Sequence, residues 1–103
     1  MGAYNLLHVP RLLPCPNCGD DGEISLQFHY GDAQLDHYRV GQAVKWGGND
    51  KGERSSGRVE FLGYQEPCGV CRFVDPRDYV ITVDGGVVVG YRMATQEDSE
   101  RLE

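Results

Sequence analysis

The strongest signal in this chain comes from two stretches, Cys15-Pro16-Asn17-Cys18-Gly19 and Cys68-Gly69-Val70-Cys71. Each contains a Cys-x-x-Cys pair, and together they hold all four cysteines of the 103-residue sequence. Four cysteine thiolates in two such pairs are the ligand set of a tetrahedral zinc site. We therefore expect the two pairs to bind one metal ion and to join distant parts of the chain. The expected ligands are Cys15, Cys18, Cys68 and Cys71.

The first pair resembles the knuckle of zinc-ribbon and rubredoxin-like proteins. In that turn, backbone N–H groups point at the sulfur atoms, Pro16 fixes φ, and Gly19 can adopt the left-handed conformation that leads the chain away from the metal. The resemblance implies a second knuckle from another hairpin, which the second pair supplies. Arg72 follows the last cysteine, where the family pattern has a glycine. The resemblance covers the knuckles and their flanks, and it implies a metal site but no activity.

The two pairs are separated by 49 residues, from Gly19 to Pro67, whereas compact zinc ribbons use about 15–20. Closing the longer loop costs roughly 1 kcal/mol more in chain entropy. Zinc binding contributes on the order of 10 kcal/mol, so the gap is no obstacle. We expect the segment between the pairs to be a folded β insertion.

The four cysteines allow three interpretations: structural zinc, iron or redox-active thiols. A shell of four cysteines leaves no position for water, which favours structural zinc over a catalytic ion. Iron is the alternative, since rubredoxin-type sites bind it with similar geometry. The stretch Cys68-Gly69-Val70-Cys71 also looks like the active turn of thioredoxin-like redox proteins. That turn needs a following helix, which residues 72–76 do not favour.

Alternating apolar residues predict several short strands and almost no helix. The clearest is 23–30, with Ile24, Leu26, Phe28 and Tyr30 on one face. Further strands are expected at 38–46, 58–64, 79–83 and 87–93, the last two joined by a hairpin turn at Asp84-Gly85-Gly86. The expected fold is mainly β: a small antiparallel sheet or open barrel, stapled by the four-cysteine site.

The chain length suits one domain. We expect an extended N-terminal arm at residues 1–14, a single metal-bound β domain at 15–94 and a flexible polar tail at 95–103. The final Leu102-Glu103 has the form of a vector-derived end. No apolar run is long enough to span a membrane. The start has no signal-peptide pattern, and paired cysteines without one indicate the reducing cytoplasm.

The formal net charge is −6, from 10 basic and 16 acidic residues. This charge disfavours nucleic acid as a partner, because a phosphate backbone would be repelled. No catalytic motif is present, so we expect a protein-interaction module rather than an enzyme. The glycine-rich segment 47–57 is the expected contact loop, and basic residues around it leave a nucleic-acid binder as the alternative. The candidate binding surface consists of Trp46, Lys45, Lys51, Arg54 and Arg58.

Overall fold

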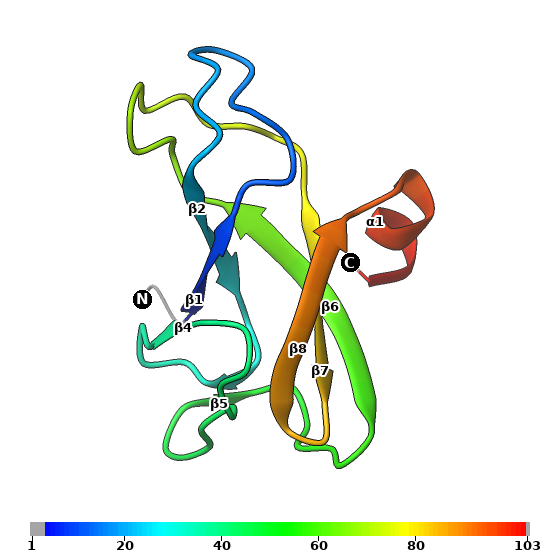
Figure 1. The fold of residues 1–103 in the computed structure, drawn as a ribbon. Coiled ribbons are helices and arrows are strands. Elements are labelled where there is room, and N and C mark those ends of the chain that lie inside the picture. The colour runs from blue at the N-terminus through cyan, green and yellow to red at the C-terminus, as the bar shows by residue number, and fades with distance from the viewer. Residues whose placement is uncertain (1–3, 103) are drawn as a thin grey trace.

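A computed structural model describes residues 4–102, which form eight β-strands and one helix (Figure 1). The strands are β1 (Asn5–Pro10), β2 (Glu23–Phe28), β3 (Gly31–Asp32), β4 (His37–Tyr38), β5 (Asp50–Lys51), β6 (Arg58–Gln65), β7 (Tyr79–Asp84) and β8 (Val87–Met93), and the helix is α1 (Gln96–Leu102). Six strands form a mixed sheet in the order β4-β1-β2-β6-β7-β8, and β3 pairs with β5. The predicted mainly β fold, with a long insertion between the cysteine pairs, is confirmed.

Strand β2 has the alternating burial that its sequence predicts. Ile24, Leu26 and Phe28 are buried, as is Tyr30 just beyond the strand, whereas His29 is exposed. This strand pairs with β1 on one side and with β6 on the other. The segment with the clearest period of two therefore lies inside the sheet, where one face is covered by the core.

The segment 1–14, expected to be an arm, contains an interior strand of the sheet, and its residues 1–3 lie outside the described part of the chain. Strand β1 pairs along its whole length with β2 and runs parallel to β4. Asn5 is fully buried; its side-chain amide donates to the Tyr30 carbonyl at 3.1 Å and accepts from the Asp36 N–H at 3.0 Å. The backbone of this segment is extended and is paired on both sides. Pro10 ends the strand.

The chain that follows β4 returns to the opposite edge of the sheet. The Gly41 N–H donates to Val88 O at 2.7 Å, the Val88 N–H to Gln42 O at 2.9 Å, and the Val44 N–H to Gly86 O at 2.8 Å. Because β4 and β8 are the two edge strands, these bonds draw the edges together around an apolar core. The buried core residues are Leu7, Val9, Ile24, Leu26, Phe28, Tyr30, Tyr38, Val44, Tyr79, Ile81, Val83 and Val88.

The strand predicted at residues 38–46 is wrong, because only its first residue belongs to one (β4). A turn interrupts it, in which the Gln42 N–H donates to Arg39 O at 3.1 Å. Gly41 has a φ of 100°, which is incompatible with a strand. Val40 is 45% exposed, whereas Tyr38 and Val44 are buried. The apolar residues of 38–46 do alternate, but Gly41 turns the backbone and so interrupts the strand.

The predicted hairpin between β7 and β8 is confirmed. Gly85 and Gly86 connect the strands and have φ values of 61° and 80°. Two successive residues with positive φ are what a type I′ turn requires, and this turn matches the twist of the strands it joins.

The segment after Thr95, expected to be a flexible tail, contains the helix α1, with Glu103 outside the described residues. Thr95 and Asp98 form a capping box: the Thr95 N–H donates to the Asp98 carboxylate at 2.9 Å, and the Asp98 N–H donates to the Thr95 hydroxyl at 3.2 Å. The carboxylate also binds Arg92 of β8 at 2.6 Å. The ion pair between Asp98 and Arg92 thus holds the helix on the sheet, and the amino-acid composition of the segment does not indicate this pair. No helix within residues 4–102 is long and apolar enough to cross a membrane.

Candidate metal centre

The sheet topology brings the two Cys-x-x-Cys pairs to the same end of the molecule. The first pair lies in the connection that leaves β1, and the second in the connection that leaves β6. Both strands are antiparallel to β2, which lies between them, so their C-terminal ends point the same way. The two connections stand together at one end of the molecule, at the top of Figure 1.

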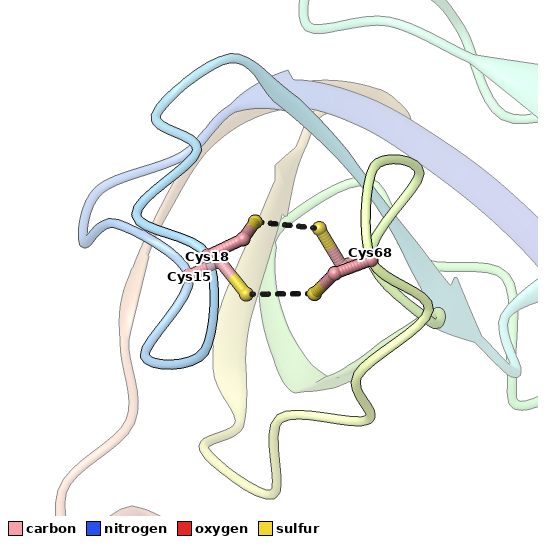
Figure 2. A group of neighbouring side chains, drawn as sticks. Cys15, Cys18 and Cys68 are labelled. Carbon is pink, nitrogen blue, oxygen red and sulfur yellow. Dashed lines mark hydrogen bonds between the residues drawn. The ribbon is translucent and has the colours of Figure 1, made fainter.

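The four cysteines form one compact cluster, as predicted. The Sγ atoms of Cys15 and Cys71 are 3.7 Å apart, and those of Cys18 and Cys68 are also 3.7 Å apart (Figure 2). All four sulfur atoms lie within 4.8 Å of one another, and all four cysteines are free. A tetrahedral ion with metal–sulfur bonds of about 2.3 Å places its ligands about 3.8 Å apart. The cluster therefore has the size and donor set to hold a metal ion.

The two turns share one backbone pattern, although their sequences differ. In the first, the Cys15 N–H donates to Asp20 O and the Gly19 N–H donates to Cys15 O, both at 2.9 Å. In the second, the Cys68 N–H donates to Phe73 O and the Arg72 N–H donates to Cys68 O, again both at 2.9 Å. The two Cys-x-x-Cys turns therefore have the same hydrogen-bonding geometry.

Arg72 adopts the same backbone conformation as Gly19. The φ angles are 68° for Arg72 and 77° for Gly19, both in the left-handed region. A non-glycine residue there is strained by roughly 1–2 kcal/mol, because its Cβ approaches the following carbonyl. The departure from the knuckle pattern at Arg72 therefore does not alter the turn, which the surrounding hydrogen bonds hold in place.

We expect substitutions at these two positions to have opposite signs. Gly19→Ala should lower the free energy of unfolding by about 1 kcal/mol, since it introduces the left-handed strain. Arg72→Gly should raise it by roughly 0.5–1 kcal/mol, because relief of strain exceeds the entropic cost of glycine. Urea unfolding of both variants measures the difference. Gly69→Ala is the control, since that glycine lacks a positive φ and has open space around it; a loss at Gly69 as large as at Gly19 would contradict the prediction.

Backbone and amide groups favour the thiolate form in the second pair. The N–H groups of Cys71 and Val70 lower the pKa of Cys68 to about 6, and the Val70 N–H lies 3.5 Å from the Cys68 sulfur. The Asn17 side chain, followed by the Phe73 N–H, lowers the pKa of Cys71. These donors stabilise negative sulfur, which is the form that binds metal.

Cys18 has the opposite tendency. The Asp20 N–H lowers its pKa, but burial and the neighbouring thiols outweigh this and raise the pKa of Cys18 to about 12. The physical reason is that several negative charges cannot gather within 4.8 Å unless a cation offsets them. A divalent ion would supply that charge, so the cluster favours binding of a cation over four independent thiols.

A set of polar contacts fixes the two cysteine loops to each other and to the sheet. Arg77 binds Asp75 at 2.6 Å within the second loop and donates to Pro14 O, next to Cys15, at 3.2 Å. The Leu12 N–H donates to the Tyr79 hydroxyl of β7 at 3.2 Å. Both loops are therefore anchored beside the ligands.

Buried Arg11 adds a contact beneath the first knuckle. Its guanidinium lies 3.7 Å from the Asp20 carboxylate and 3.3 Å from the Gln65 side-chain oxygen. Asp20 is also the residue whose carbonyl accepts the Cys15 N–H. Arg11 thereby links β6 to the turn that carries the first two ligands.

Comparison with known proteins found no match to any family model, curated protein or solved structure.

The structure divides the candidate binding surface. Trp46 and Arg54 line one pocket. Lys45 lies 4.0 Å from the Asp36 carboxylate, Lys51 belongs to the short β5, and Arg58 begins β6 opposite Asp84. That these residues act as one binding surface remains a prediction.

The sequence does not predict one further feature, a pair formed by His8 and His37 on the outer side of the sheet. The two rings are hydrogen-bonded at 2.7 Å, and the other ring nitrogen of His8 contacts the Ser25 hydroxyl at 2.8 Å. These residues come from β4, β1 and β2. The parallel pairing of β1 with β4 brings them together, and no local sequence signal indicates it.

We expect the histidine pair to make stability depend on pH. Burial, followed by His37 and Arg39, lowers the pKa of His8 below 6.5, and Glu23 opposes them. The unfolded chain then binds a proton more readily than the folded one, so stability falls as the pH drops below about 6.5.

The test is urea unfolding at about pH 7.5 and about pH 5.5, where the unfolded state gains the proton. His8→Gln should lose less stability between the two values than the unmodified chain. Comparison of the variants subtracts the titration of the cysteines, which both share. His29→Gln is the matched control, because His29 lies outside the pair; an equal effect of both substitutions would refute the role of the pair.

Proposed function

We propose that Cys15, Cys18, Cys68 and Cys71 hold a structural zinc ion in a protein-interaction module. The observation that carries the metal assignment is the pairing of two backbone-matched knuckles whose sulfur atoms lie 3.7 Å apart across the cluster. Zinc fits four thiolates without a preference for another geometry. Four ligands leave no open position for water or substrate, which supports a structural ion over a catalytic one.

Elemental analysis of the purified protein, combined with a thiol count after denaturation and chelation, tests the zinc assignment. One zinc and four released thiols per chain are expected. One iron per chain with a visible charge-transfer band would show a rubredoxin-like iron site instead of a zinc site. A metal-free protein with disulfides would overturn the metal assignment and point to thiol redox chemistry.

The interaction role is supported by apolar side chains on the loops that carry the cysteines. Among residues 4–102, five of the nine exposed large apolar side chains lie there. Val70 and Val74 are 68% and 61% exposed. The residues are Leu12, Leu13, Val70, Phe73 and Val74. Exposed apolar groups gathered on neighbouring loops favour contact with another protein, and reduced cysteines favour a reducing compartment such as the cytoplasm.

Affinity capture from a source cell extract tests this role. A specific partner should be retained by the unmodified chain and lost when Val70 and Val74 are both replaced by lysine. Val40→Lys is the control, because Val40 is also exposed but lies in the turn after β4. Equal capture by the two lysine variants would exclude the cysteine loops as the contact surface.

A further inference from the structure

A second candidate site lies at the opposite end of the molecule from the cysteines. A pocket of about 460 Å³ is formed between the segment after β4, the loop before β6 and the turn between β7 and β8. In Figure 1 this turn and this loop are at the bottom, away from the two cysteine loops. The volume falls within the range of about 300–1,000 Å³ that small-molecule sites occupy.

One wall of the pocket is apolar and contains the single tryptophan of the chain. Ala43, Val44 and Trp46 form this wall. The indole packs edge-on against Tyr30, with ring centroids 5.1 Å apart and planes at 79°. Tyr30 belongs to the buried core, so this contact fixes the position of Trp46. The wall therefore presents a fixed aromatic surface to a ligand.

The loop before β6 contributes positive charge to the pocket. Among residues 4–102, Arg54 is the only charged residue that lines it, and Ser55 and Ser56 lie beside Arg54. The Ser55 hydroxyl accepts the Gly57 N–H at 3.1 Å. Within residues 4–102, Arg54 makes no ion pair or hydrogen bond, so its guanidinium is available to an anionic group.

The three segments are joined to one another, which gives the pocket a defined shape. The Tyr30 hydroxyl donates to Glu53 O at 2.9 Å, next to Arg54. The Gly85 N–H donates to Gly57 O at 3.3 Å, and the Val44 N–H donates to Gly86 O at 2.8 Å. Tyr30 thus supports the indole wall and the arginine wall together, and the hairpin turn closes the third side.

We propose that this pocket binds a small molecule in which a planar ring carries a carboxylate or phosphate group. The ring lies against Trp46, and the anionic group binds the Arg54 guanidinium, with the Ser56 hydroxyl as a further donor. The overall charge of −6 does not oppose this, because surface charges beyond about 8 Å are screened at physiological salt. The proposal is independent of the metal site and of any protein partner.

Trp46 provides the measurement, because its fluorescence reports on the pocket alone. Phenyl phosphate is the probe, and for a ligand of this size we expect a saturable change with a Kd of about 1 mM. Benzylamine has the same ring with a positive charge, and inorganic phosphate has the charge without a ring. Both should bind at least about tenfold more weakly, since each lacks one of the two recognised groups.

Two arginine variants of the metal-loaded chain test whether phenyl phosphate binds in this pocket. Arg54→Ala should weaken phenyl phosphate at least about tenfold, because a charge-assisted contact is lost. Arg58→Ala removes the same charge nearby, from a residue that does not line the pocket, and should change the Kd by less than about twofold. Equal weakening by both variants, equal binding of benzylamine, or no saturable signal up to about 10 mM phenyl phosphate would overturn the proposal.

Discussion

Removal of the proposed zinc ion is expected to unfold the chain. Closed four-cysteine zinc sites contribute on the order of 10 kcal/mol, whereas domains have a total stability of about 5–15 kcal/mol. The four cysteines come from the β1–β2 and β6–β7 connections, so a bound ion would cross-link two loops that are far apart in the sequence. Without it, the thiolates favoured at Cys68 and Cys71 would repel one another.

Circular dichroism and amide hydrogen exchange during chelation measure this effect. The β-sheet signal should disappear on chelation and return when zinc is added. Cys68→Ser should reproduce the loss, because a hydroxyl is a poor ligand for zinc in place of thiolate. Val70→Ser is the matched control, since this side chain lies between two ligands but is 68% exposed. A chelated chain with an unchanged unfolding midpoint would show that the sheet core suffices and that the site is not structural.

Gly31→Ala is expected to lower the free energy of unfolding by about 3 kcal/mol, from left-handed strain and overpacking together. Gly31 has a φ of 81°, and a Cβ there would lie 2.4 Å from Val44 Cγ1 and 2.9 Å from Lys45 O. Neither neighbour can move freely, because Val44 is buried and bonded to the hairpin turn. Since Val44 lines the pocket, the substitution should also disturb the wall that holds Trp46.

Thermal unfolding and the emission maximum of Trp46 measure the two effects of Gly31→Ala. Gly48→Ala is the control, because Gly48 lies in a neighbouring loop, has no positive φ and has no atom within 4 Å of an added Cβ. It should leave stability and emission nearly unchanged. A Gly31 variant as stable as the Gly48 variant would show that the β3–β5 region yields to the added methyl group.

Two segments differ from the structure that their sequence predicted, each for its own reason. In residues 38–46 the apolar alternation indicated a strand, but Gly41 turns the chain and the segment bonds to β8 instead. In residues 95–103 the polar composition indicated a flexible tail. The Thr95-Gln96-Glu97-Asp98 stretch matches a capping box and would have indicated the start of a helix.

Features that depend on neighbouring residues could be predicted from the sequence. The four-cysteine cluster follows from cysteine spacing, the buried face of β2 from a period of two, and the β7–β8 turn from two adjacent glycines. Each of these rests on ligand chemistry or on local backbone preference, which a few residues express.

Features that depend on distant partners could be found only in the three-dimensional fold. The interior place of β1 requires β2 and β4 on its two sides, and the hydrogen bond between His8 and His37 exists because β1 and β4 run in parallel. The left-handed conformation of Arg72 is set by the hydrogen bonds of its knuckle, against the preference of its own residue type. The pocket beside Trp46 is made from three segments that meet only when the edges of the sheet approach each other, and no single segment encodes it.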